Sequence, residues 1–425
     1  MKKLLYSIFQ DTWFSPWYLV YVLVGAVAAG ILPILVPLSV SSAGAGSIGI
    51  IMAVLNLGGL LAGAFGFLCD RYRLHRIMVL SGLGVVAAGV ALFPAATALA
   101  PRILLSLIIG TGIAAVSTVA NLLIVEVYPK DQWDSRIGWL QTFYGLGQVA
   151  GLLLAGFFSG RIFDGLLLTS AVSAAALAAA LFTVHTPAKS ASPLRARPVA
   201  VRHGEWSINS PDRSHHHMSL RVLKSIRLLY ATPLGIFLIG WLFVYTGAAG
   251  IFSLYPVLYK ELFHISPTVS SIGFAAAAAV GLFLYAPAGT WSDRIGAVKI
   301  LKASLLIRIA AFLCLWLLTF MPGSSAGTLS LLLFGVIVLA WSPISVSSVA
   351  FTASVSSVGE GEAMGLYNTA SSAAAIIGSL AGGMIAAAAG YRSVPLLAAG
   401  LLGIGLLIHV RFLHASKYHA QEGPQ

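Results

Sequence analysis

Charged residues are scarce in this sequence of 425 residues. Asp, Glu, Lys and Arg make up 9% of the chain, hydrophobic residues make up 58%, and the mean hydropathy is +0.92. Soluble globular domains carry roughly 25% charged residues. The shortage of charge therefore excludes an ordinary soluble fold and predicts a protein that lies largely within a membrane.

Cysteine and the signatures of catalysis are also scarce. Cys69 and Cys314 fall in or beside different apolar segments, so no disulfide framework is expected. No pair of carboxylates, metal-binding cluster or activated nucleophile occurs in or near the apolar segments, which argues against a membrane enzyme. The sequence lacks the Gly-x-x-x-x-Gly-Lys-Ser/Thr loop that binds ATP, so ATP-driven transport is disfavoured and no cofactor is expected.

The sequence does contain long apolar segments. A helix needs about 20 apolar residues to cross a bilayer, and twelve segments meet that length. They are rich in Gly and Ala and lack the alternation of membrane β-strands. The predicted fold is an all-α membrane protein with twelve transmembrane helices, at residues 17–40, 47–69, 77–97, 102–127, 137–159, 165–184, 230–258, 267–291, 300–321, 326–350, 363–389 and 393–412.

Basic residues are distributed unevenly between the two sides of the predicted membrane. Because the number of helices is even, both termini lie on one side, and all but five of the 25 Lys and Arg residues fall there. The positive-inside rule makes this side cytoplasmic, which predicts a multi-pass protein of the cytoplasmic membrane with both termini inside. The net charge of +12 thus reflects topology, and no nucleic-acid partner is expected. The five exceptions are Arg102, Arg161, Lys260 and Arg392 on the outer side and Arg308 within a helix.

Residues 185–229 divide the apolar segments into two groups of six. This stretch is rich in Pro, Ser, Arg and His and has no sustained apolar period, which is typical of a linker. We therefore expect an N-terminal six-helix bundle at 1–184, a cytoplasmic linker at 185–229 and a C-terminal six-helix bundle at 230–425. The linker contains His215, His216 and His217 without a second ligand cluster, so a flexible polar tract is favoured over a metal site.

Two short motifs recur once in each half of the chain. Gly66-Phe-Leu-Cys-Asp70-Arg71 is matched 223 positions later by Gly289-Thr-Trp-Ser-Asp293-Arg294, each at the cytoplasmic end of an apolar segment. Gly147-x-x-x-Gly151 is matched by Gly378-x-x-x-Gly382, and small residues four apart let membrane helices pack closely. The recurrence indicates an internal duplication.

With these motifs the chain resembles the transporters of the major facilitator superfamily, over essentially all twelve segments. The signature loop of that family is approximately G-x-L-a-D-R-x-G-R-R. The first copy departs from it at Arg73, where the family usually has Gly, and at Leu74, whereas the second copy keeps Gly296. The resemblance implies two pseudo-symmetric six-helix bundles around a central cavity, and secondary transport by alternating access.

The resemblance also implies that the repeated loops form an ionic latch on the cytoplasmic side. A carboxylate at a helix end accepts from the N-terminus of a neighbouring helix, and an arginine pairs with an acid across the loop. The expected acid is Glu126, with Arg136 on the following loop; the alternative is that these charges only set the topology. The residues assigned to the latch are Gly66, Asp70, Arg71, Arg76, Glu126, Arg136, Gly289, Asp293, Arg294, Gly296 and Lys299.

The substrate path must be lined by neutral groups, because none of the 13 Asp and Glu residues falls at a clear mid-membrane position. Amides, hydroxyls and aromatic rings on shared helical faces suit a small, neutral or weakly polar organic ligand. The alternative role of these side chains is hydrogen bonding between helices. The candidates are Asn56, Thr118, Asn121, Gln141, Tyr144, Gln148, Trp241, Tyr245, Tyr367 and Asn368.

The fifth span bears on the direction of transport. Antiporters of the superfamily carry G-x-x-x-G-P-x-x-G-G there, and in this chain Leu152 and Ala155 replace the proline and the next-to-last glycine. We expect a monomer that exports small amphipathic organic compounds, with proton coupling left open because Leu107 stands where many members have an arginine. Uptake of a sugar or other small metabolite is the alternative, and a non-transporting sensor or scaffold is the alternative of another class.

Arg308 is the sole charge deep within a predicted helix. A charge at that depth is expensive and usually functional. The guanidinium suits an anionic substrate, but ninth spans in this fold are usually peripheral. Snorkelling of the side chain towards the cytoplasmic interface is therefore favoured.

Overall fold

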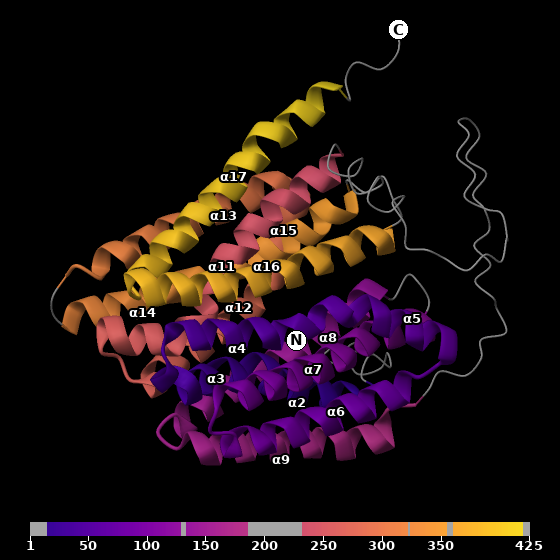
Figure 1. The fold of residues 1–425 in the computed structure, drawn as a ribbon. Coiled ribbons are helices and arrows are strands. Elements are labelled where there is room, and N and C mark those ends of the chain that lie inside the picture. The colour runs from indigo at the N-terminus through magenta and orange to yellow at the C-terminus, as the bar shows by residue number, and fades with distance from the viewer. Residues whose placement is uncertain (1–14, 129–132, 186–231, 322–323, 355–359, 420–425) are drawn as a thin grey trace, which may run out of the picture.

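The computed structural model describes residues 15–128, 133–185, 232–321, 324–354 and 360–419, and all regular structure within them is helical (Figure 1). Twelve helical segments in this part of the chain are long and apolar enough to cross a membrane. The predicted all-α fold and the predicted number of spans are confirmed. The predicted linker, with its three histidines, lies almost entirely outside the described residues.

The first six spans form one bundle, coloured indigo to magenta in Figure 1. Glycines Gly58 and Gly59 are weak helix formers, and the second span changes there to a short 3-10 segment. The elements are α2 (Tyr18–Gly25), the π-helical η1 (Ala26–Ile31), α3 (Leu32–Val40), η2 (Ser41–Ala43), α4 (Ala45–Leu57), η3 (Gly58–Leu61), α5 (Ala62–Tyr72), α6 (His75–Leu92), η4 (Phe93–Ala95), α7 (Leu99–Val127), α8 (Trp133–Phe158) and α9 (Ile162–Thr183).

The last six spans form the second bundle, coloured rose to yellow. The tenth span is broken at Ala340, two residues before Ser342-Pro343, and its two parts are separate helices. The elements are α11 (Pro233–Phe263), α12 (Pro267–Ile295), α13 (Ala297–Leu318), α14 (Ser324–Leu339), α15 (Trp341–Ser354), α16 (Glu360–Ala389) and α17 (Ser393–His419).

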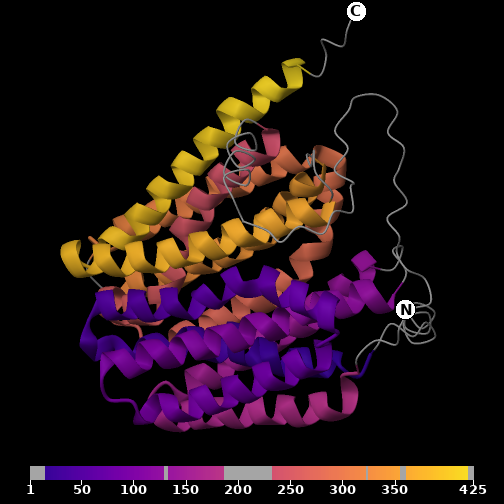
Figure 2. The ribbon, with the colours of Figure 1, turned by 45° about the vertical axis from the view of Figure 1, so that its right-hand side comes forward.

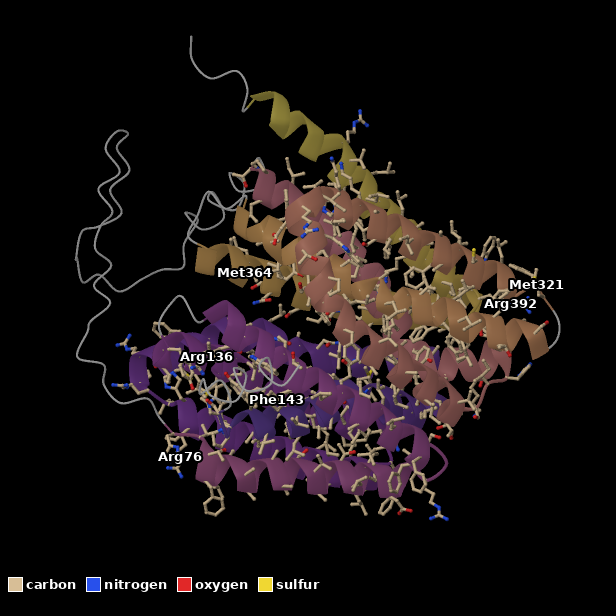
Figure 3. All side chains as sticks on the ribbon, turned by 180° about the vertical axis from the view of Figure 1, so that it is seen from behind. Arg76, Arg136, Phe143, Met321, Met364 and Arg392 are labelled. Carbon is tan, nitrogen blue, oxygen red and sulfur yellow. The ribbon has the colours of Figure 1, made fainter. Side chains whose placement is uncertain are left out.

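The up-and-down order of the helices gives the molecule two distinct ends. We call the end that carries Arg71, Arg76, Arg294 and Lys299 the basic end, and the other end, which carries Ser159 and Thr268, the opposite end. Figure 3 shows Arg76, Arg136 and Met364 towards the basic end and Met321 and Arg392 at the opposite end.

Glycines allow the closest helix contact in the first bundle. A Cβ atom on Gly147 of α8 would overlap the carbonyl oxygen of Val22 in α2. A Cβ atom on Gly151 would overlap the carbonyl oxygen of Ala26 in the neighbouring π-helical turn. The fifth span therefore packs on the first span backbone to backbone.

The second bundle repeats this arrangement. A Cβ atom on Gly378 of α16 would overlap the carbonyl oxygen of Thr246 in α11. A Cβ atom on Gly382 would lie 2.6 Å from the carbonyl oxygen of Gly250. The eleventh span thus packs on the seventh as the fifth packs on the first, so the sequence repeat has a structural counterpart.

Candidate functional site

The two bundles touch each other at the opposite end. A Cβ atom on Gly49 of α4 would lie 2.6 Å from the carbonyl oxygen of Ser379 and 2.8 Å from the Cα atom of Gly383, both in α16. Ser159, after α8, and Thr268 of α12 join the bundles by a hydrogen bond of 2.9 Å between their hydroxyls. At this end α4 packs closely on α16 and α8 on α12.

Towards the basic end the bundles separate. The last glycine contacts between them join Gly59 to Ser372 of α16, and Gly145 of α8 to Leu282 of α12. Residues seven positions apart lie on one helix face. Each of these four helices has a glycine seven positions closer to the basic end, namely Gly66, Gly138, Gly289 and Gly365. A Cβ atom on any of these glycines would meet nothing within 4 Å. The ribbons diverge in the same direction in Figure 2.

The loop between α5 and α6, at the basic end, turns tightly and is tied to α7. Arg73 follows α5 with a φ of 55°, a left-handed conformation that costs energy for a residue with a Cβ atom. His75 Nε2 lies 2.9 Å from Glu126 Oε1, and the two side chains are 1% and 29% exposed. This is the one ion pair between side chains that the structure describes. It is an ion pair only when the imidazole of His75 is protonated.

Arg71 and Arg76 of this loop point away from Glu126. Arg71 is exposed, with its guanidinium carbon 5.5 Å from the centroid of the Tyr72 ring, and Arg76 Nη2 donates to the Leu181 carbonyl oxygen at 3.0 Å. The expected pairing of a loop arginine with Glu126 stays a prediction for the closed latch, and in this structure His75 lies at the carboxylate instead. The physical reason is that α6 begins at His75 and packs along α7, which brings the imidazole to the carboxylate.

Two other latch residues of the first bundle have separate surroundings. Arg136 is 6% exposed, and its guanidinium carbon lies 3.4 Å from the centroid of the Tyr128 ring. Asp70 belongs to α5, but its side chain is outside the described part of the structure. Arg136 therefore fastens the start of α8 to the end of α7.

The second copy of the motif forms the turn between α12 and α13. Gly296 has a φ of 103°, which a residue with a side chain rarely adopts. Asp293, Arg294 and Lys299 are exposed, and none of them forms an ion pair with another described residue. With the bundles apart, these charges meet no opposite charge among the described residues of the first bundle.

An aromatic cluster in the second bundle contains three of the predicted cavity residues. Trp241 of α11 is fully buried and stacks on Tyr367 of α16, with ring centroids 5.0 Å apart and an interplanar angle of 28°. Tyr245 lies 5.7 Å and Trp341 6.1 Å from the Trp241 ring, centroid to centroid. We call these four residues the aromatic wall.

Hydroxyl groups hold the aromatic wall in place. Trp241 Nε1 donates to Ser371 Oγ at 2.8 Å, and the Tyr367 hydroxyl lies 2.9 Å from Ser348 Oγ. Asn368, which follows Tyr367, is exposed. The wall is therefore a rigid apolar surface that carries a few fixed polar atoms, as small-molecule sites do.

The predicted cavity residues of the first bundle are more dispersed. The side chains of Asn56 and Thr118 bond backbone carbonyls of their own helices at 2.8 Å, and that of Asn121 does so at 3.3 Å. Gln141 is exposed, and Tyr144 and Gln148 are half-buried. Tyr144 lies near enough to Tyr245 of the second bundle for their side chains to interact electrostatically. Predicted residues of the two halves therefore approach each other at this point.

Arg308 does not snorkel. Its side chain is 1% exposed and is enclosed by α11, α13 and α15. The guanidinium carbon lies 5.4, 5.5 and 5.8 Å from the ring centroids of Trp341, Phe252 and Phe312. The sequence-based expectation was wrong because α13 packs against α15 and α17, so the face that carries Arg308 is inside the bundle.

Sequence reasoning missed Trp341, Ser348 and Phe252. The signal for Trp341 is the Ser342-Pro343 dipeptide that follows it, because irregular backbone within a span is tolerated where it is buried in protein or lines a cavity. Ser348 lies two turns further along α15, so the same break positions it. Phe252 is one of many aromatic residues in α11, and only the packing distinguishes it.

One protein family matches the chain. A family model described as Major Facilitator Superfamily matches residues 17–359 and, in a second match, residues 237–424. A comparison with curated proteins finds no significant match.

Solved structures resemble the chain in fold. The nucleoside transporter NupG is 13% identical with a TM-score of 0.70, covering 93% of this chain and 97% of its own. A D-xylose-proton symporter is 14% identical with a TM-score of 0.70, covering 93% and 96%. A bacterial homolog of the human lysosomal transporter Spinster, in an inward-facing and occupied conformation, is 15% identical with a TM-score of 0.68, covering 96% and 98%.

Proposed function

Because the chain belongs to the major facilitator superfamily, it is a multi-pass secondary transporter and not an enzyme, and we propose that it exports small amphipathic organic compounds by alternating access. The observation that carries the proposal is the one-sided contact between the bundles. They touch through Gly49 and Thr268 at the opposite end and are apart at Gly66 and Gly289. A rocking motion that reverses this pattern would expose the region between them to the other side.

The repeated loops are the parts that meet when the basic end closes. Gly66 and Gly289 leave open space, so a neighbouring helix can approach the backbone at both places. Asp70 and Asp293 would then lie beside the approaching helix ends, whose N-termini attract carboxylates. In this proposal the predicted bundles 1–184 and 230–425 move as units, joined by the linker 185–229.

The basic end is cytoplasmic in this proposal. Positively charged loops stay in the cytoplasm, and the basic end carries Arg71, Arg76, Arg294 and Lys299. The resemblance to a Spinster homolog in an inward-facing conformation supports the same sidedness. The structure then corresponds to a transporter of the cytoplasmic membrane that is open to the inside and ready to load cargo for export.

The aromatic wall supports an amphipathic cargo. The half-buried rings of Trp341 and Tyr245 offer apolar surface, and the buried rings of Trp241 and Tyr367 pack behind them. Ser371 and Ser348 bond the polar atoms of these two buried rings. Aromatic rings with a few fixed hydrogen-bonding groups suit organic molecules that are partly apolar better than they suit sugars, which need many hydrogen bonds.

Transport by purified protein in lipid vesicles tests the proposal. We expect movement of amphipathic organic compounds from a panel that also contains sugars, and faster movement when a proton gradient is imposed. Movement that ignores the pH gradient would remove proton coupling, and movement of sugars alone would favour the uptake alternative. If no compound of the panel is transported, a role as a sensor or scaffold is favoured.

Replacing Asp70 by Asn is expected to abolish transport without reducing the amount of protein in the membrane, because the latch loses its carboxylate while the helix is unchanged. Initial transport rates, normalised to surface expression, measure the effect. Asp164→Asn is the matched control, since Asp164 is an exposed carboxylate in the first turn of α9 at the opposite end. Normal transport by a variant that carries both Asp70→Asn and Asp293→Asn would contradict the latch hypothesis.

A further inference from the structure

Arg308 is a buried charge that forms no ion pair with another described residue. Its Nε and Nη1 atoms have no hydrogen-bond partner among the described residues, and the side chain is 1% exposed. It lies midway along α13, whereas every Asp and Glu among the described residues lies near an end of its helix. No acid in the described part of the chain therefore lies at its depth.

The surroundings of Arg308 leave its N–H groups unsatisfied. The rings of Trp341, Phe252 and Phe312 lie 5.4 to 5.8 Å from the guanidinium carbon, at cation–π distance. Such contacts favour the charge but do not accept the hydrogen bonds of Nε and Nη1. An unpaired polar group in a dry interior is costly, and a charged one more so.

The unsatisfied guanidinium adjoins the aromatic wall. Trp341 contacts Arg308 and also lies 5.7 Å from Tyr245, ring to ring. Tyr245 lies within the range of electrostatic interaction of both Arg308 and Tyr144 of the first bundle. Trp341 and Tyr245 are half-buried, so a cargo that reaches Arg308 from the region between the bundles would have to displace these two rings.

We propose that Arg308 is a binding residue for the acidic group of the cargo, so that the cargo is an amphipathic organic anion. This inference rests on the proposed transport function and names the charge of its substrate. The unpartnered N–H groups on Nε and Nη1 lie on different edges of the guanidinium, and each can donate to an oxygen of a carboxylate or sulfonate. The apolar body of the cargo packs on the half-buried rings of Trp341 and Tyr245.

A matched set of naphthalene compounds tests this proposal. Naphthalenesulfonate, the neutral naphthalenesulfonamide and the cationic naphthylmethylammonium share a ring system and differ in charge. Binding to the purified full-length protein is measured by the shift of the thermal unfolding midpoint with ligand concentration. We expect the wild type to bind the sulfonate about tenfold more tightly than the sulfonamide, or better, because charge-assisted hydrogen bonds exceed neutral ones by that order.

The variant Arg308→Gln should lose this preference while its affinity for the sulfonamide stays the same. Arg392→Gln is the matched control, because Arg392 also lies over an aromatic ring, 5.5 Å from Phe320, but at the opposite end. It should keep the preference. Arg308→Lys retains the charge without the planar guanidinium and should keep a weaker preference, which separates anion binding from a purely structural role.

Two results would overturn the proposal: a wild type that binds the neutral or cationic compound as well as the sulfonate, or an Arg308→Gln variant with its preference intact. If Arg308→Gln does not fold, the compound preferences of the wild type and of Arg308→Lys still test the proposal.

A parallel measurement of transport in phosphatidylcholine vesicles, which contain no anionic lipid, separates the two proposals. Sulfonate binding without transport contradicts export and leaves the anion site standing. Transport that shows no preference for anions supports export and contradicts the anion site.

Discussion

A disulfide between positions 159 and 268 is expected to abolish transport, and its reduction is expected to restore it. The hydroxyls of Ser159 and Thr268 lie 2.9 Å apart, one in each bundle, so cysteines at these positions have their sulfur atoms close to bonding distance. The bond would hold the opposite end closed, and alternating access requires that end to open. Transport by Ser159→Cys/Thr268→Cys is measured before oxidation, after oxidation and after treatment with dithiothreitol.

The control for this experiment uses the natural cysteines. Cys69 is buried and Cys314 is exposed, so both are first replaced by alanine and the transport rate of that background is established. Each single cysteine variant should then transport equally well before and after oxidation. Undiminished transport by protein that is shown to be cross-linked would contradict alternating access through this end.

Adding one methyl group at Gly147 is expected to destabilise the protein severely. The Cβ atom of Gly147→Ala would overlap the Val22 carbonyl oxygen, and backbone cannot move aside as a flexible side chain can. Overpacking of this kind costs about 1–3 kcal/mol or more. The thermal unfolding midpoint of the purified variant measures the effect, and a reduced yield from the membrane should accompany it.

Gly138→Ala in the same helix is the matched control. A Cβ atom there meets nothing within 4 Å, so the substitution should stabilise α8 by about 0.5–1 kcal/mol through the better helix propensity of alanine. The second bundle offers the same pair in α16, with Gly378→Ala over Thr246 and Gly365→Ala in open space. Equal unfolding midpoints for the two variants of a pair would show that close helix packing at these glycines does not stabilise either bundle.

The fold was predictable because membrane insertion leaves a strong mark on a sequence. A span must be apolar over its whole length, and twelve such segments were recognisable without any knowledge of their packing. The glycine pairs at 147 and 378 were recognisable for a related reason, since only small residues admit backbone contact. Which helix they would contact was beyond the sequence, because α8 and α2 are far apart in the chain.

The candidate site was predictable only in part. Trp241, Tyr245 and Tyr367 were chosen as polar or aromatic residues on helix faces, and they do lie together. Trp341, which completes the wall, comes from a helix that starts within the tenth span. The contact between His75 and Glu126 was also beyond the sequence, because it arises from the packing of α6 on α7.

The sequence by itself determined the class of protein, the twelve spans, the duplication and the absence of any acid at mid-membrane depth. These properties follow from local composition and spacing, because each span must meet the bilayer on its own. The tertiary structure alone decided that the bundles touch at one end and that Arg308 lies inside the second bundle. Both depend on which faces of distant helices meet, and in a membrane that choice rests on shape and hydrogen bonding between helices that are all similarly apolar.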